Sequence, residues 1–417
     1  MVSKLKLLYS QYPRQYWLMI TGVVISTAGG SMIWPFLLIY ASGKLHLPLS
    51  TVATLISINA GTGLLASFLA GTLADKIGRK VVMVFSLFVN GIAYFFLMRA
   101  ETYPHFVILM VFIGLSNPLY QVGADAMLAD MIPSEQRTDA YAINRIANNS
   151  AFAIGPAVGG FLASTSYNLA FYCASIGFLF YSLLLFFMAK ETLHTAQSES
   201  HNISLAEQLS ATEKRNMSNG YLNVFSDKGY MAFVSLVAVG LTAPTMLWIL
   251  MPVYAKLNFN VPEAMYGWIP TTNAIMCVFI QYPITQITRK YKTLPVTAIG
   301  MLAYALGVGS VAFMTGFSGF LLSMIILTFG ELIIVPTASK YVADIAPADL
   351  RGRYMSVYWL AWGLARTCAP LIGGFLNDKF FPQAIWIGGL LIGLTSAFGL
   401  TLLNSFSKKR SSLLTQP

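Results

Sequence analysis

The sequence predicts an all-α membrane protein in which twelve transmembrane helices form two pseudo-symmetric six-helix bundles. Three observations predict this fold: an apolar composition, twelve apolar stretches of spanning length, and an internal repeat. Of the 417 residues, 56% are hydrophobic and 10% are charged, whereas soluble domains are about 45–50% apolar and ~25% charged. Because so few charged residues cannot coat a water-facing surface of this area, most of the surface must face lipid.

Twelve stretches are long enough to cross a bilayer. A transmembrane helix needs ~20 apolar residues to cross ~30 Å of hydrocarbon. Only helices satisfy the backbone here, because the sequence lacks the ten-residue alternating strands of a membrane barrel. To within a few residues at each end, we predict spans at residues 17–41, 51–74, 81–98, 104–128, 140–164, 169–189, 230–255, 264–287, 295–314, 317–343, 354–377 and 383–405.

The basic residues orient the chain. Nineteen of the 26 Lys and Arg residues lie in both tails and in every second loop between spans, whereas the opposite loops hold four. Because basic loops stay cytoplasmic, we predict a multi-pass protein of the cell membrane with both termini cytoplasmic. The net charge of +10 then reflects this topology and contact with anionic inner-leaflet lipid. A nucleic-acid surface needs basic residues gathered on a soluble domain, so we expect no nucleic-acid partner.

The two halves of the chain repeat at a constant offset, the one that separates Trp34 from Trp248. Each half holds six spans, which is the parallel repeat of secondary transporters with a substrate site at the midplane; two fused bundles without a transport role are the alternative. We predict a cytoplasmic tail (1–16), an N-terminal bundle (17–189), a cytoplasmic linker (190–229), a C-terminal bundle (230–405) and a second cytoplasmic tail (406–417). The same offset superposes Met32, Asn59, Asp130, Arg137 and Gly160 on Met246, Asn273, Asp344, Arg351 and Gly374.

The loop between the second and third spans reads Gly71-Thr-Leu-Ala-Asp75-Lys-Ile-Gly78-Arg79-Lys80. Its glycines permit a tight turn, Asp75 can meet a helix N-terminus, and Arg79 and Lys80 hold the inner face. A basic turn that only sets topology explains Arg79 and Lys80 but leaves Gly71, Asp75 and Gly78 without a reason.

This loop resembles the signature of the major facilitator superfamily, and the resemblance extends over the whole chain through the twelve spans and the repeat. It implies that Asp130 and Arg137, with Asp344 and Arg351, are inner-loop partners of the motif that latch the outward-open state. The equivalent loop of the second half, residues 286–292, lacks both the acid and the glycines.

The fifth span contains Gly155, Pro156, Gly159 and Gly160. It resembles the antiporter motif of that superfamily, with Ala151 in place of the first glycine, and implies a twelve-span drug/proton exporter. Close helix packing around small residues, with a bend at the proline, is the alternative explanation.

Two ionisable residues lie deep in predicted spans, where each costs ~2.5–3.5 kcal/mol on insertion scales. Glu331 is near the middle of the tenth span, and Gly330-Glu331 with Pro336 resembles a multidrug/proton antiporter subgroup, which implies that Glu331 is a protonation site. A static ion pair is the alternative. Arg366 lies at a similar level in the eleventh span and either pairs with Glu331 or meets an anionic substrate.

Uncharged polar and aromatic residues in spans complete the candidate substrate site: Asn59, Asn273, Gln121, Asn148, Asn149 and Trp248. Asp125 and Arg145, near the cytoplasmic ends of consecutive spans, are expected to form a structural ion pair. The three cysteines and four histidines show no metal-binding spacing, so we expect no metal and no cofactor, with the proton as coupling ion.

The leading hypothesis is a secondary-active, proton-coupled exporter of lipophilic or cationic drug-like compounds that works by alternating access. The alternative is a porter of a small polar metabolite (sugar, amino acid or organic anion) whose charge meets Arg366. A membrane enzyme or receptor is disfavoured, because no catalytic motif such as HExxH or a P-loop is present. We therefore expect a non-enzymatic monomer whose partners are a small-molecule substrate and lipid.

Overall fold

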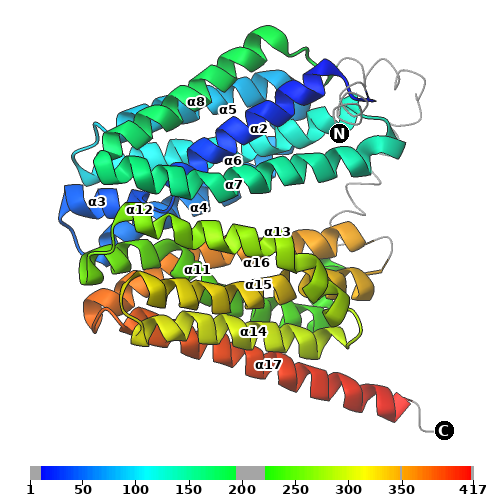
Figure 1. Cartoon of the computed structure of the whole chain (residues 1–417). Helices are drawn as coiled ribbons and strands as arrows, with labels where there is room; N and C mark the ends of the chain where they lie inside the picture. The colour runs from blue at the N-terminus through cyan, green and yellow to red at the C-terminus, as the bar shows by residue number, and fades with distance from the viewer. Residues whose placement is uncertain (1–10, 194–220, 348–349, 415–417) are drawn as a thin grey trace. The chain divides into compact units, whose positions relative to one another are not determined.

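The computed structural model describes residues 11–193, 221–347 and 350–414, and these residues form helices joined by short connections, without a strand (Figure 1). Each of the twelve predicted spans coincides with one helix or with two consecutive helices, which confirms the fold class. The first half contains α2 (Arg14–Ile33), α3 (Leu37–Leu45), α4 (Leu49–Ile77), α5 (Arg79–Leu97), α6 (Tyr103–Met131), the 3₁₀ turn η1 (Ser134–Gln136), α7 (Arg137–Thr165) and α8 (Tyr167–Met188). The second contains α11 (Lys228–Phe259), α12 (Glu263–Tyr266), α13 (Trp268–Thr288), α14 (Thr293–Ser310), η2 (Val311–Phe313), α15 (Gly316–Ile345), α16 (Arg351–Lys379) and α17 (Ala384–Leu414).

Two helices differ from the predicted spans. The first span is broken after Ile33, where a turn at residues 34–36 separates α2 from α3; Pro35 lies in that turn and has no backbone N–H to donate. The last helix continues to Leu414, through most of the predicted C-terminal tail. The predicted linker, 190–229, lies largely outside the described residues.

Three of the predicted spans are less apolar than a typical membrane helix. Nine helices of the described chain are long and apolar enough to cross a membrane by themselves. The predicted spans that fall short are α7, α13 and α16, the fifth, eighth and eleventh. Since polar side chains in a span face the bundle interior or a water-filled cavity, these three helices are where polar functional groups are expected.

The helix boundaries reproduce the sequence repeat. The offset that separates Trp34 from Trp248 carries α7 (Arg137–Thr165) onto α16 (Arg351–Lys379) end to end, and both helices are 29 residues long. The same offset carries the start of α2 and the end of α3 onto the start and the end of α11. The repeat is therefore structural as well as sequential.

Contacts divide the described residues into two compact units. Unit 1 comprises residues 11–47, 58–193 and 262–274, and unit 2 comprises residues 48–57, 221–261, 275–347 and 350–414. The division cuts α4 after Ser57 and α13 after Ala274, so each unit contains the first part of a span from the other half. The predicted bundles contained no such exchange.

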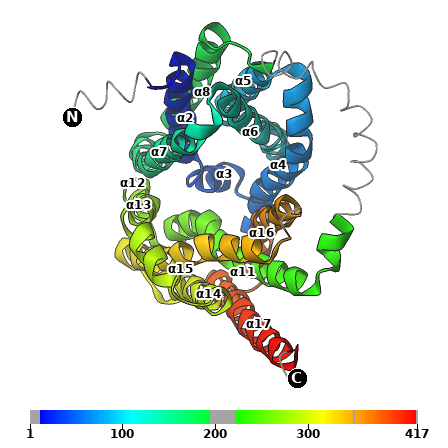
Figure 2. The same ribbon diagram turned by 90° about the vertical axis from the view of Figure 1, so that its right-hand side faces the viewer.

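Unit 1 is held together by close helix contacts with polar side-chain ties. In it α2 packs on α7 and α8, and α5 packs on α6 and α8; Figure 2 shows these helices nearly end-on. The Tyr16 hydroxyl donates to the carbonyl of Ala140 at 3.0 Å, and the Ser175 hydroxyl donates to the carbonyl of Gly91 at 2.7 Å. Small residues and hydroxyls tie helices where lipid removes the hydrophobic driving force for association.

Unit 2 follows the same rules. In it α14 packs on α15 and α17, and α11 packs on α16 and α17. The side chain of Trp386 is fully buried and stands edge-on to the ring of Tyr254, with ring centroids 5.0 Å apart. The Ser396 hydroxyl ties α17 to α11 by donating to the carbonyl of Leu236 at 2.7 Å.

Candidate functional site

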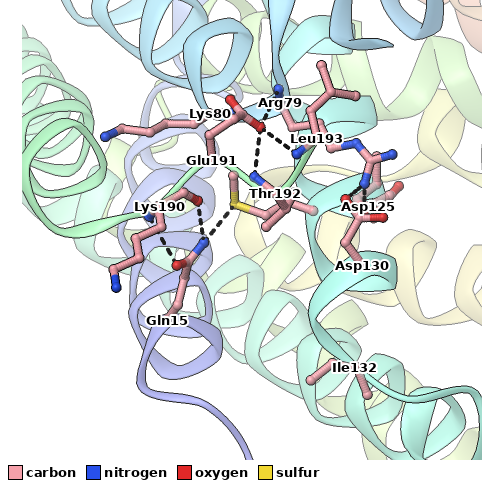
Figure 3. A network of polar contacts seen from close by, with 12 residues as sticks. Gln15, Arg79, Lys80, Asp125, Asp130, Ile132, Lys190, Glu191, Thr192 and Leu193 are labelled. Atoms are coloured by element: carbon pink, nitrogen blue, oxygen red, sulfur yellow. Dashed lines mark hydrogen bonds and ion pairs between the residues drawn. The ribbon is translucent and has the colours of Figure 1, made fainter. Parts of the chain in front are cut away.

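The loop motif forms a capped helix start (Figure 3). Gly78 is the N-cap residue of α5, and the carboxylate of Glu191 accepts hydrogen bonds from the backbone N–H groups of Arg79 at 3.1 Å and Lys80 at 3.0 Å. These N–H groups have no partner within the helix, and a negative charge at a helix N-terminus is stabilised by the helix dipole. Glu191 therefore ties the start of α5 to the segment after α8.

A second set of hydrogen bonds fixes this segment to α2. The side chain of Gln15 exchanges hydrogen bonds with the backbone of Lys190, donating to its carbonyl at 2.8 Å and accepting from its N–H at 3.0 Å (Figure 3). The Glu191 carboxylate also accepts from the N–H of Thr192 and of Leu193. Sequence reasoning missed Glu191; its signal is a lone acid directly after the sixth span.

Gly78 is required by its conformation and by its neighbour. Its φ of 110° lies in the region that side chains disfavour. A Cβ at this position would also lie 2.5 Å from a carboxylate oxygen of Glu191. By contrast, a Cβ at Gly71 would meet open space, so nothing in the structure explains a glycine there.

The structure brings Arg79 and Asp130 together. The Arg79 guanidinium forms an ion pair with Asp130 at the end of α6 and donates to the carbonyl of Ala126 at 3.1 Å. Asp75 is exposed, and Arg137 donates to the carbonyl of Ile132 at 3.0 Å. The motif therefore ties α5 to α6 and, through Glu191, to the end of α8.

The second half lacks an equivalent arrangement. Asp344 pairs with Lys340, one turn earlier on α15, at 2.5 Å, and both side chains are exposed. Arg351 is exposed at the first turn of α16. The structure therefore does not join Asp344 to Arg351.

The glycines of the fifth span are contact points on two sides of α7. A Cβ at Gly155 or Gly159 would collide with α2, at Ser31 and Met32 respectively. A Cβ at Gly160 would collide with the backbone of Glu263 in α12, and the carbonyl of Pro156 leaves no room for a Cβ at Gly267. Gly155 and Gly159 thus bring α7 against α2. Gly160 brings α7 against residues 262–274, the part of the second half that belongs to unit 1 and is called its exchanged segment.

The eleventh span repeats this contact in unit 2. A Cβ at Gly374, the repeat equivalent of Gly160, would lie 2.6 Å from the Cα of Ser50 in the exchanged start of α4. The Ser50 N–H donates to the carboxylate of Asp378 at 2.7 Å. Each unit therefore receives the start of the other half's second span against a glycine.

A buried acid lies at the exchanged segment of unit 1. Glu263 is only 6% exposed, and its carboxylate accepts a hydrogen bond from the hydroxyl of Tyr167 at 2.5 Å. Sequence reasoning missed both this contact and the one at Asp378, because each joins residues far apart in the chain.

Glu331 lies halfway along the 30-residue helix α15, and it is half-buried. The neighbouring Gly330 faces α14, because a Cβ there would press on the backbone of Gly300 and Tyr304 at 2.9 Å.

Arg366 lies halfway along the adjacent helix α16, as Glu331 does along α15, and its side chain is exposed. Asn273 is buried and Trp248 is half-buried in α13 and α11.

Asn59 acts inside unit 1 as a helix tie. Its side-chain N–H donates to the carbonyl of Met110 on α6 at 3.1 Å, and a Cβ at Gly114 would lie 2.5 Å from the Asn59 carbonyl. The amide is therefore used for packing α4 against α6.

The expected ion pair between Asp125 and Arg145 is not formed within the described part of the chain. The Asp125 carboxylate instead accepts from the side-chain N–H of Gln121 at 3.2 and 3.4 Å, and Arg145 is exposed on α7. Gln121, Asp125 and Asn148 line a common cavity, whereas Asn149 is exposed and does not line it.

Twelve spans in two repeats, with polar groups in the fifth, eighth and eleventh spans, are the architecture of a multi-pass membrane transporter. The chain belongs to the Major Facilitator Superfamily, whose sequence model matches residues 19–254 and again residues 231–415.

Several curated relatives match nearly the whole chain at low identity. The Na(+), Li(+), K(+)/H(+) antiporter of Planococcus maritimus is 25% identical over 377 residues, covering 86% of both chains. The quinolone resistance protein NorA of Staphylococcus aureus is 23% identical and covers 91% of this chain and 95% of its own. The uncharacterized transporter YqjV of Bacillus subtilis is 24% identical, with coverages of 91% and 90%.

Solved structures agree on the fold. The nucleoside transporter NupG is 14% identical with a TM-score of 0.75, covering 94% of this chain and 99% of its own. A POT family transporter in complex with 5-aminolevulinic acid is 14% identical, also with a TM-score of 0.75, covering 95% and 96%. At such identities the likeness shows the fold alone.

Proposed function

We propose that this transporter is a proton-coupled exporter of lipophilic, cationic compounds that works by alternating access. The observation that carries the proposal is Glu331, a half-buried carboxylate in the middle of a 30-residue helix whose other charged residues, Lys340 and Asp344, lie near its end. Ionisable groups at such a depth mark proton relays and ion pathways. The names of two relatives, a quinolone resistance protein and a cation/H(+) antiporter, support the same class of activity.

Glu331 couples the movement of protons to the movement of substrate because its carboxyl group has an ionised and a protonated form. When Glu331 is ionised it attracts a cationic substrate, and when it is protonated it is neutral and no longer attracts that substrate. A ligand shifts a conformational equilibrium only by its difference in affinity for the two states. Export is therefore driven when Glu331 is protonated from the outside and deprotonated on the inside, provided that substrate and proton stabilise opposite conformational states.

The substitution Glu331→Gln tests the proposal, because glutamine keeps the size and the hydrogen bonding of the acid but cannot change charge. Full-length protein in proteoliposomes is given a pH gradient and a fluorescent lipophilic cation. We expect gradient-driven uphill transport to fall at least about tenfold, while exchange of the cation without a gradient persists. The matched control is Glu101→Gln, which removes an exposed acid between α5 and α6. Undiminished uphill transport by Glu331→Gln would refute proton coupling at this residue.

A second candidate function rests on Arg366. Its charge lies halfway along α16, on one of the three polar spans, and guanidinium groups bind carboxylates and phosphates bidentately. A porter of a small organic anion would use it. Binding of organic anions that disappears in Arg366→Gln, together with no binding of lipophilic cations, would favour this candidate over the exporter.

We further propose that the protein is a monomer in the cell membrane, with both termini cytoplasmic, the proton as coupling ion and anionic lipid at its inner face. The basic loops support this orientation. A reporter enzyme active only in the cytoplasm, fused after Pro417, should be active. An inactive reporter would contradict the proposed topology.

A further inference from the structure

A small polar cavity lies in unit 1, between α2, α6 and α7. Its volume is about 30 Å³, and its polar lining consists of Tyr120, Gln121, Asp125, Asn144 and Asn148, with Thr27 from α2. A cavity of this size holds one water-sized particle. A small ion or a water molecule therefore fits this space.

The polar groups converge because of helical spacing. Gln121 and Asp125 are four residues apart on α6, and Asn144 and Asn148 are four residues apart on α7, so each pair lies on one face of its helix. Arg145 follows Asn144 by one residue, which turns it about 100° away from this face. The cavity is thus walled by one carboxylate and several uncharged polar groups from two helices.

We propose that this cavity is a binding site for a small monovalent metal cation, Na⁺ or Li⁺. The available ligand atoms are oxygens of a carboxylate, amides and hydroxyls, which hard cations prefer. The cavity contains no imidazole or thiol, and the described residues hold no cluster of three or more acidic, His or Cys side chains that would suit a divalent or transition metal. One carboxylate matches one positive charge.

The hydrogen bonds leave ligand atoms available. Gln121 uses its N–H group to donate to Asp125, so its amide oxygen remains an acceptor. Tyr141 donates to the backbone carbonyl of Asp125, at 3.2 Å, and not to its carboxylate. A bound cation would bridge α6 and α7, and it would neutralise a carboxylate within a membrane helix. The site does not depend on proton coupling at Glu331.

Cation binding to purified full-length protein in detergent tests the site directly. Na⁺ or Li⁺ is titrated at constant ionic strength against choline, and the midpoint of thermal unfolding is recorded. We expect a saturable upward shift with Na⁺ and Li⁺, because a ligand that binds only the folded state stabilises it by mass action. Choline, which is too large for the cavity, should give none.

Variants locate the effect. Asp125→Asn should abolish the Na⁺-dependent shift, and Asn148→Leu should weaken the apparent affinity at least about tenfold, the equivalent of ~1.4 kcal/mol. The control Glu101→Gln, which removes an exposed acid outside the cavity, should leave the titration unchanged. If Asp125→Asn proves unstable, Asn148→Leu with Asn144→Leu decides the question. An equal shift with choline, or a Na⁺ shift that survives these substitutions, would overturn the proposal.

Discussion

The carboxylate that caps α5 makes a prediction that can be worked out from the structure. Glu191 accepts from the first two N–H groups of the helix, at 3.1 and 3.0 Å. Removing an N-cap acceptor costs ~0.5–2 kcal/mol, and losing a charge at a helix N-terminus costs a further ~0.3–1 kcal/mol. We therefore expect Glu191→Ala to lower the free energy of unfolding by about 1–3 kcal/mol.

Gly78→Ala should act partly through the same cap. Its backbone strain at a φ of 110° costs ~1–3 kcal/mol, and its Cβ, 2.5 Å from the Glu191 carboxylate oxygen, displaces the cap as well. In a Glu191→Ala background the cap is already lost, so only the strain remains. The two substitutions together should thus cost about 1–3 kcal/mol less than the sum of their separate effects.

Thermal or denaturant unfolding of the detergent-solubilised protein measures this double-mutant cycle. A change of about 1 kcal/mol shifts the midpoint by about 2–4 °C for a unit of roughly 150–250 residues. Gly71→Ala paired with Glu191→Ala is the control cycle, because a Cβ at Gly71 meets open space. If the Gly78 cycle were additive within ~0.3–0.5 kcal/mol, the cap would not be the reason for the glycine.

Two further substitutions test the contacts at the exchanged segments. Gly374→Ala places a Cβ 2.6 Å from the Cα of Ser50, and since backbone cannot move aside, we expect a loss of ~1–3 kcal/mol in thermal unfolding, whereas Gly71→Ala should be nearly neutral. Tyr167→Phe removes a 2.5 Å hydrogen bond from the buried Glu263 and should cost ~1.5–3 kcal/mol. The exposed Tyr172 provides the control, and equal midpoints for Tyr167→Phe and Tyr172→Phe would contradict this reasoning.

Hydropathy and the repeat were enough to predict the helices, but not where proline breaks one. The chain turns at Pro35, between α2 and α3, yet α11 continues through Pro244 and Pro252. A proline frees a carbonyl one turn earlier in the helix, and neighbouring helices decide whether that carbonyl finds another partner. That compensation is tertiary, so composition alone does not predict it.

The candidate site was predictable only where a local pattern determines the contact. The loop motif indicated Arg79 and Gly78 from their spacing, but their partner Glu191 is 112 positions from Arg79 and reads in the sequence only as part of a polar connection. Asp125 was expected to pair with Arg145 because both lie near cytoplasmic ends of consecutive helices. Gln121 is one turn away on the same helix, whereas Arg145 is rotated off the face that holds Asn144 and Asn148.

The exchanged segments show which contacts are common to both repeats and which are specific to one half. Gly160 and Gly374, equivalent positions in the repeat, both meet the backbone of the start of the other half's second span. The acids beside them are not equivalent: the offset pairs Glu263 with Leu49, and Asp378 with Ser164. In one unit the carboxylate belongs to the entering segment, and in the other it belongs to the receiving helix. Because the backbone contact recurs and the polar contacts do not, close approach at a glycine is the common structural requirement, and each carboxylate stabilises only its own unit.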